Sequence, residues 1–293
     1  MKKVASLRYG VIFKKAFCDP EIFTAFVRDT AGVDIEIDVV ETEKEFDPPV
    51  GYVKSRFDLF AQDPKNRLVV DIQHERYSDH YDRFMHYHMA AVLEQVKNAE
   101  DYTPPMTVFT IVVLTSGDRH KKDMAVIGFD PKDLKGNSLG EIKHKVIYLC
   151  PKYVNDETPE PFRSWLLAIQ DTLDGEVDET VYQKSEICKI FDHIEKDSVS
   201  PGERAKMFDE YGLEKLGDEK FAEGEIKGEI KGEIKGKIEG KIEGKIEGKI
   251  EGKIEGKIEG EIKGKIETAR KMKAKGYETE EIADLTGLAV EEI

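Results

Sequence analysis

Apolar and polar residues alternate most regularly between Ser55 and Gln73. This pattern predicts two short strands joined by a turn at residues 63–66, where Asp-Pro-Lys-Asn is favourable turn chemistry. Side chains on a strand point alternately to opposite faces. One predicted face is apolar and carries Phe57, Leu59, Ala61, Val70 and Ile72. The other face is mainly polar and carries Arg56, Asp58, Val69, Asp71 and Gln73.

The length of the turn decides whether the two acids of this hairpin meet. If the loop holds an even number of residues, Asp58 lies directly across from Asp71, and Arg56 lies across from Gln73. Opposed carboxylates on neighbouring strands are roughly 5 Å apart at Cβ and repel each other, so a positive charge is expected between them. Mg²⁺ is the simplest candidate, because it takes oxygen ligands, keeps several waters and binds phosphate oxygens. The alternative is that both acids face solvent on a half-exposed hairpin.

The segments around the hairpin predict a mixed arrangement of helices and strands. Asp19-Pro20 divides residues 7–31 into two helices, with Asp as the N-cap and Pro at the first helical position. Further strands are expected at 34–43, 107–115, 124–129 and 145–150, and the apolar run at 107–115 is typical of a central strand. Further helices are expected at 76–100, at 162–173 around Trp165, and in two or three pieces at 181–216. The predicted fold class is α/β, with a mixed sheet covered by helices on both sides.

A four-residue repeat follows this region. From Gly224 to Gly264, glycine recurs at every fourth position, with isoleucine midway between and one Glu and one Lys in each unit. On an α-helix this spacing turns the isoleucine stripe by about 40° per repeat, and each Gly costs about 1 kcal/mol relative to Ala. On a strand, Ile and Gly would share one face, so periodicity alone does not choose. We favour a long helix that acts as a spacer, with self-association as the second interpretation.

Residues 268–293 resemble the opening of a helix-turn-helix, with Gly276 between two helices and Thr279 as the N-cap of the second. The sequence ends at Ile293 before a recognition helix, so we expect a small helical cap and no sequence-specific DNA reading by this segment. Four parts are predicted: a core at 1–155, a helical extension at 156–222, the repeat at 223–267 and the cap at 268–293.

Composition and charge narrow the class of protein. A net charge of -15 argues against a protein that coats nucleic acid, for which a basic surface is expected, although a local basic patch would still hold phosphates. Cys18, Cys150 and Cys188 form no CxxC pair and indicate small buried residues in a reducing compartment. The basic start has no apolar run after it, and no later segment is apolar enough to span a membrane, so we expect a cytoplasmic protein.

Histidines cluster in the helix predicted at 76–100 and just before it. His74, His80, His86 and His88 contain no HxxxH pair, and an HxH on a helix points its two rings in different directions. We interpret them as partly buried histidines and not as a zinc site. In the same helix Arg83 and Tyr87 are four residues apart and share a face that can point back toward the hairpin.

Asp58, a gap, and then Asp71-Ile72-Gln73 on the next strand resemble the core of the PD-(D/E)XK nuclease superfamily, with Gln73 in the lysine position. The segments LRYGVIFKKAF, KSRFDLFAQD, VVDIQ and YDRFMHYHMAAVLEQVKNAEDY are similar to Rpn-type recombination-promoting nucleases, also described as PD-(D/E)XK nuclease family transposases. The resemblance covers about the first half of the chain. Gly10 stands where that family usually has an acid, whereas Lys14 and Lys15 keep its basic pair.

This resemblance implies a restriction-endonuclease-like fold and a Mg²⁺-dependent DNA endonuclease, with Mn²⁺ as a substitute ion, linked to recombination or transposition. Asp58 and Asp71 would hold the metal with the backbone carbonyl of Ile72, and Gln73 would orient the attacking water. The missing lysine charge would come from a second metal, from Arg83 or from Lys54. Three residues are candidate phosphate contacts: Lys54, Arg83 and Tyr87. The alternative is an inactive nuclease-fold protein that acts as an interaction module or forms homo-oligomers through its repeat.

Overall fold

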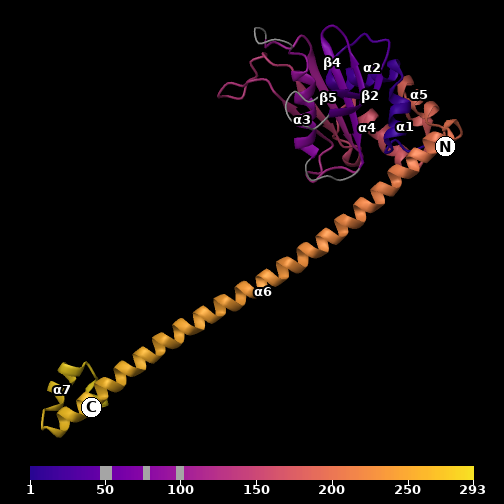
Figure 1. Cartoon of the computed structure of the whole chain (residues 1–293). Helices are drawn as coiled ribbons and strands as arrows, with labels where there is room; N and C mark the ends of the chain where they lie inside the picture. The colour runs from indigo at the N-terminus through magenta and orange to yellow at the C-terminus, as the bar shows by residue number, and fades with distance from the viewer. Residues whose placement is uncertain (47–54, 75–79, 97–101) are drawn as a thin grey trace. The chain divides into compact units, whose positions relative to one another are not determined.

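The computed structural model describes residues 1–46, 55–74, 80–96 and 102–293, apart from the side chains of 214, 217–226, 228 and 229. Contacts divide the chain into two compact units, Met1–Glu219 and Lys220–Ile293 (Figure 1). Residues 156–219 therefore pack in the same unit as residues 1–155.

A six-stranded mixed sheet forms the centre of the first unit, in the order β2-β3-β4-β5-β7-β6. The strands are β2 (Glu41–Phe46), β3 (Ser55–Gln62), β4 (Asn66–Gln73), β5 (Thr107–Leu114), β6 (Met124–Gly128) and β7 (Lys145–Leu149). β4, β5 and β7 run parallel, whereas β2, β3 and β6 pair antiparallel to their neighbours. β5 lies between two parallel strands and is buried along nearly its whole length, as its apolar sequence predicts.

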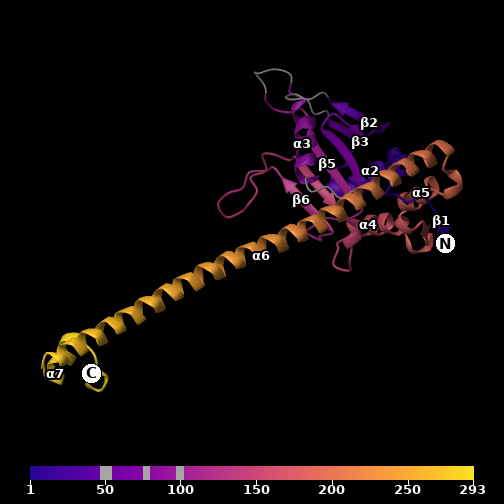
Figure 2. The ribbon, with the colours of Figure 1, turned by 60° about the horizontal axis from the view of Figure 1, so that its bottom comes forward.

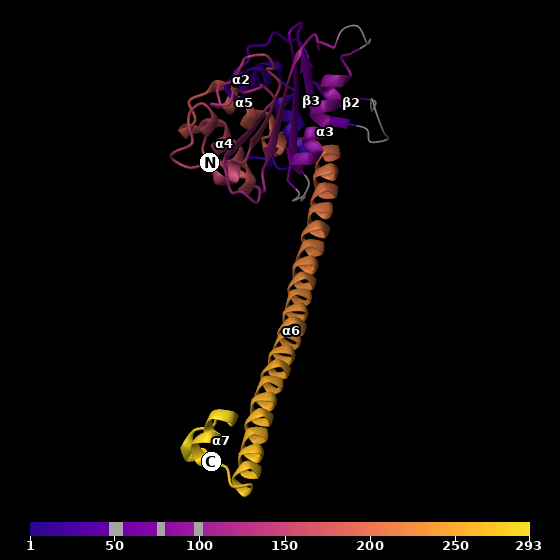
Figure 3. The ribbon, with the colours of Figure 1, turned by 90° about the vertical axis from the view of Figure 1, so that its left-hand side faces the viewer.

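Helices cover both faces of this sheet, so the predicted α/β class is confirmed (Figures 2 and 3). One face packs in a large core with α1 (Gly10–Phe17), α2 (Pro20–Ala31), α4 (Phe162–Asp171) and α5 (Ser185–His193). The opposite face packs in a smaller core against α3 (His80–Leu93). The short strands β1 (Lys2–Lys3) and β8 (Glu176–Val177) pair with each other apart from the main sheet. Short 3₁₀ turns connect several of these elements at Pro151–Tyr153, Thr172–Asp174, Glu179–Val181 and Lys196–Ser198.

The helix pair near the N-terminus follows the predicted signals. The Asp19 side chain accepts hydrogen bonds from the backbone N–H groups of Glu21 and Ile22 at the start of α2. Gly32 ends α2 with φ of 70°, a left-handed conformation that glycine adopts without steric cost. The two helices therefore begin and end where local backbone hydrogen bonds can be satisfied.

Two expectations about strands are wrong. The strand predicted at 34–43 begins only at Glu41. A strand over 34–40 would place Ile35 and Val39 on one face and Val40 on the other, but Ile35 and Val40 are buried and Val39 is exposed. On β3, Phe57 does not share a face with Leu59: it packs under α3 against Phe46 and Tyr87, whereas Leu59 packs in the core under α1.

This change of face has a local cause. The β2–β3 ladder pairs Thr42 with Leu59 and Lys44 with Phe57, but Glu43 and Asp58 between them form no pair. Glu43 has φ of 57°, which is uncommon for a residue with a side chain. The strict alternation assumed along β3 is therefore interrupted at Asp58.

The strands predicted at 107–115, 124–129 and 145–150 and the helix predicted at 162–173 are confirmed within two residues, whereas the first helix begins at Gly10 and the helices predicted from residue 181 begin only at Ser185. α3 covers the middle of the helix predicted at 76–100, and the two ends of that prediction extend into 75–79 and 97–101, outside the described residues. In α4 the indole of Trp165 is fully buried and donates a hydrogen bond of 2.8 Å to Asp29 on α2. Its ring packs against Phe26, which joins α4 to α2 in the large core.

A single helix, α6 (Pro201–Ala274), starts in the first unit and continues through the repeat. The helix favoured for the repeat is therefore confirmed. Its described isoleucines from 230 to 262 are each about half exposed. α7 (Thr279–Thr286) and a final turn at Val290–Glu292 follow, and α7 packs through Ile282 in the second unit. The N-cap of α7 is Glu278 and not Thr279 as predicted. No helix in the described part of the chain is long and apolar enough to cross a membrane.

Candidate active site

The β3–β4 hairpin brings the two predicted acids together. Leu59 pairs with Val70 and Gln62 with Arg67, so the loop between them is even in length and the register places Asp58 opposite Asp71. The turn is held by the Asp63 carboxylate, which accepts hydrogen bonds of 2.7 Å and 2.6 Å from the next backbone N–H groups, those of residues 65 and 66. The predicted parity of this loop is confirmed.

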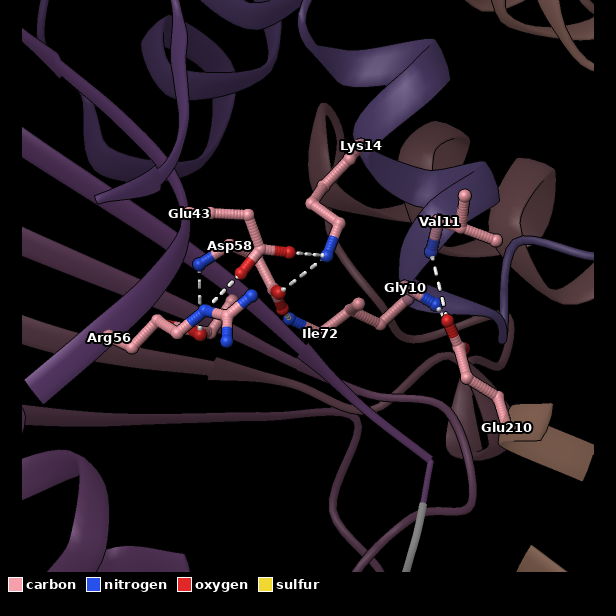
Figure 4. A network of polar contacts seen from close by, with 9 residues as sticks. Gly10, Val11, Lys14, Glu43, Arg56, Asp58, Ile72 and Glu210 are labelled. Atoms are coloured by element: carbon pink, nitrogen blue, oxygen red, sulfur yellow. Dashed lines mark hydrogen bonds and ion pairs between the residues drawn. The ribbon is translucent and has the colours of Figure 1, made fainter. Parts of the chain in front are cut away.

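Two hydrogen bonds connect Asp58, Asp71 and Ile72. The Asp58 backbone N–H donates to Oδ1 of Asp71 over 3.4 Å. The Ile72 backbone N–H donates to Oδ2 of Asp58 over 3.1 Å (Figure 4). The observed contact of Ile72 uses its N–H, whereas the predicted ligand is its carbonyl. Each carboxylate thus reaches the backbone of the opposite strand, and the three predicted residues form one group.

Asp71 is an unusual carboxylate. Its residue is only 6% exposed, and its Oδ2 accepts no hydrogen bond from any residue that the structure describes. Burial and the neighbouring charge of Asp58 together raise the pKa of Asp71 well above its usual range. A buried carboxylate oxygen with no donor is destabilising unless a cation or a proton joins it.

Lys14 of α1 places a positive charge against this pair. Its Nζ lies 3.3 Å from Oδ1 of Asp58 and also pairs with Glu43, which in turn pairs with Arg56 (Figure 4). Burial disfavours the charged form of Lys14, but the charges and hydrogen bonds of Asp58 and Glu43 raise its pKa overall. Sequence reasoning noted Lys14 as a basic residue without assigning it to the acids, because only tertiary packing carries α1 to the hairpin.

Gln73 points toward α3. Its Oε1 accepts a hydrogen bond of 3.2 Å from Arg83, and Arg83 also donates to the Tyr87 hydroxyl over 3.4 Å. The Arg83 guanidinium lies 5.3 Å from the centre of the Tyr87 ring. The predicted common face of Arg83 and Tyr87, directed at the hairpin, is therefore observed. Lys54, the other predicted phosphate contact, lies outside the described residues.

Glu210 of α6 is a further acid that sequence reasoning did not single out. It accepts hydrogen bonds from the backbone N–H groups of Gly10 over 2.7 Å and of Val11 over 3.3 Å, at the first turn of α1. It is half-buried, and burial raises its pKa. The contact joins residues 200 positions apart, so no local signal could have revealed it.

Within the described ranges, no group of three or more His, Cys, Asp or Glu residues is arranged to hold a metal ion. His88 is fully buried, bonds the Thr110 hydroxyl through Nδ1 and stacks on Phe129. The three cysteines are free, with Cys150 buried and the other two half-buried.

A separate hollow of about 380 Å³ is lined by residues of β2, β3 and β4 together with Glu94. Its main cation, Arg67, is 6% exposed, bonds Glu94 over 2.7 Å and covers the rings of Phe46 and Phe60. A second cation, Lys44, lies over the Phe60 ring and pairs with Glu41. Both cations there already pair with a carboxylate, so the hollow is a weaker candidate than the Asp58–Asp71 pair.

Comparison with protein-family models, with curated proteins and with solved structures gave no match to this chain.

Proposed function

We propose that this protein is a Mg²⁺-dependent endonuclease that hydrolyses phosphodiester bonds of DNA, on a restriction-endonuclease-like variant of the α/β fold. The observation that carries the proposal is the buried Oδ2 of Asp71, which has no described hydrogen-bond donor and belongs to a carboxylate placed directly beside Asp58. Two hard oxygen donors on adjacent strands are the ligand type that Mg²⁺ or Mn²⁺ prefers.

The residues present fit such an ion. Asp58 and Asp71 supply two carboxylates, and the chain passes directly into Ile72, whose carbonyl is the predicted third oxygen. A bound cation would offset the repulsion between the carboxylates and the burial of Asp71. When bound, the ion would polarise the scissile phosphate and lower the pKa of a coordinated water.

The chain's own cations would complete the chemistry. Gln73 is neutral and cannot supply the charge of a lysine, but Lys14 stands 3.3 Å from Asp58 and Arg83 bonds the Gln73 side chain. In the proposed reaction Lys14 stabilises negative charge that develops on the phosphate, while Arg83 and Tyr87 hold a neighbouring phosphate. Gln73, oriented by Arg83, positions the attacking water.

A plasmid-nicking assay tests this assignment. Purified protein with Mg²⁺ is expected to convert supercoiled DNA to the open form, and chelation by EDTA is expected to stop it. Asp58→Ala and Asp71→Ala should each remove the activity, whereas Asp130→Ala, in an exposed loop of the same unit, should keep it. Unchanged nicking by both active-site variants would refute the assignment.

One observation favours a second function, that of an inactive nuclease-fold protein that acts as an interaction module. The Lys14 ammonium already pairs with Asp58, and Gln73 would stand in the lysine position of the resembled family. Titration calorimetry separates the two functions, since an inactive relative should show no Mg²⁺ or Mn²⁺ binding that depends on Asp58. We propose DNA as the partner, a role in recombination or transposition, and a cytoplasmic location, which the three free cysteines support.

A further inference from the structure

The first turns of α6 pack along α1 beside the candidate active site. Glu203 pairs with Lys15 over 3.1 Å, and Glu210, two turns later, accepts the backbone N–H groups at the start of α1. Figure 4 shows Glu210 approaching Gly10 and Val11 on the side of α1 from which Lys14 reaches Asp58. Both contacts lie inside the first compact unit, which extends to Glu219.

The space left by the missing side chain of Gly10 is bordered by both Glu210 and Lys14. A Cβ placed on Gly10 would lie 3.8 Å from both carboxylate oxygens of Glu210 and 3.8 Å from Nζ of Lys14. The carboxylate and the ammonium therefore border the same small space. The charge of Glu210 acts on both Lys14 and Asp58.

We propose that Glu210 is a positioning residue of the cation site, and that the first three turns of α6 therefore belong to the catalytic unit. This inference rests on the proposed function of Asp58 and Asp71. Glu210 does not need to touch the cation: it fixes the N-terminus of α1 and adds a third carboxylate near the Lys14 ammonium, after Asp58 and Glu43.

The physical reason lies in the competition for Asp58. Lys14 and a divalent cation both require the Asp58 carboxylate, so a cation binds there more readily if other carboxylates, Glu43 and Glu210, hold the ammonium away from Asp58. Glu210 also adds negative charge to a site that must attract a doubly charged ion. The buried Oδ2 of Asp71, which has no hydrogen-bond donor among the described residues, independently marks a ligand position that the chain's own cations do not fill.

Calorimetric titration of the full chain with Mn²⁺ tests the inference. Glu210→Gln keeps the shape of the side chain but removes its charge, and we expect roughly tenfold weaker Mn²⁺ binding, the lower end of the range found for residues that support metal ligands. Glu203→Gln is the matched control, because it makes the same change on the same helix and contacts Lys15 and Ser200 instead. Its Mn²⁺ affinity should stay within about twofold of the unsubstituted protein.

A rescue variant separates a loss of charge from a loss of folding. In Gly10→Asp combined with Glu210→Gln, the new carboxylate enters the space beside Lys14, and the affinity for Mn²⁺ should return toward that of the unsubstituted protein. Thermal unfolding without metal shows whether each variant is folded. If Glu210→Gln is too unstable to titrate, Gly10→Asp in that background decides: a folded double variant with restored affinity supports the role, and one with weak affinity refutes it.

The outcomes distinguish this inference from the function on which it rests. If the unsubstituted protein binds no Mn²⁺, or if Asp58→Asn binds it equally well, the cation site itself is refuted. If Asp58→Asn abolishes binding while Glu210→Gln binds as tightly as the unsubstituted protein, the cation site stands and only the role of Glu210 is refuted.

Discussion

Asp71→Asn should make the cation-free protein more stable while removing its cation binding. Asp71 is buried next to Asp58, and its Oδ2 has no described hydrogen-bond donor. Asparagine has nearly the same shape, keeps an oxygen for the Asp58 backbone N–H, and carries no charge beside the Asp58 carboxylate. A residue that only contributed to folding would lose stability on this change, so the sign of the effect separates a functional carboxylate from a structural one.

The magnitude follows from burial and pKa. Because the pKa of Asp71 is raised, the native protein binds its proton more tightly than the unfolded chain, so this carboxylate lowers stability as the pH rises through the unfolded pKa toward the folded pKa. Above the folded pKa the full penalty is present, and a buried, unsatisfied polar group costs about 1–3 kcal/mol. Removing the charge should therefore raise the melting temperature by roughly 2–4 °C for each kcal/mol gained.

Tryptophan fluorescence is a suitable assay, because Trp165 is the only tryptophan and is fully buried in the first unit. Thermal unfolding is followed in EDTA at pH 7.5 and again with Mg²⁺ in excess. The unsubstituted protein should gain stability with Mg²⁺, by about 2.7 kcal/mol at a hundredfold excess over the dissociation constant, and Asp71→Asn should gain none. Asp130→Asn is the matched control, since this exposed carboxylate accepts three backbone N–H groups and its loss should not stabilise the protein.

Two results would refute this reasoning. One is a lower melting temperature for Asp71→Asn than for the unsubstituted protein in EDTA, which would mean that the Asp71 carboxylate is stabilising as it stands. The other is an equal rise in melting temperature with Mg²⁺ in both proteins, which would place any bound cation elsewhere.

Three further predictions concern the fold. Gly117→Ala should destabilise the protein by about 1–3 kcal/mol more than Gly136→Ala in urea unfolding, because both glycines have positive φ but only a Cβ at 117 would clash, 2.5 Å from the Tyr153 ring. Burial lowers the pKa of His88 to about 3, so the free energy of unfolding should fall as the pH drops from about 6.5 toward 3. About 2–3 kcal/mol should be lost at pH 4.5, and His88→Asn should make stability less dependent on pH in this range. A Cβ at Gly244 in α6 would meet no atom within 4 Å. Gly244→Ala should therefore stabilise the repeat helix by about 0.5–1 kcal/mol and increase the helical circular dichroism signal that remains at high temperature.

The pairing of the two acids could be predicted from the sequence because it depends on local rules. The chemistry of a four-residue turn, and the even number of residues in it, set the register of β3 and β4. The helix boundary at Asp19 and the central position of β5 also follow from nearby residues, through an N-cap and a continuous apolar run. Such features need no knowledge of which segments meet in the folded chain.

The surroundings of the acids could not be predicted in this way. Lys14 reaches Asp58 across 44 positions and Glu210 reaches Gly10 across 200, and both contacts require that α1, α6 and the sheet pack together. The position of Phe57 was predicted wrongly because the positive φ of Glu43 on the neighbouring strand interrupts the alternation at Asp58. Backbone distortion of this kind has no reliable signal in a strand sequence.

The geometry of the repeat helix helps to decide between the two proposed functions, an endonuclease and an interaction module. Isoleucines spaced four apart turn by about 40° per repeat, so the stripe circles the helix once in roughly nine repeats. A straight partner helix would meet only a few successive isoleucines before the stripe rotated away, and contacts along i and i+4 ridges favour crossing helices over a long parallel seam. The half-exposed isoleucines of α6 are therefore poorly arranged for extended self-association. A spacer is the better use of such a helix, and the Asp58–Asp71 pair is accordingly the stronger basis for assigning a function.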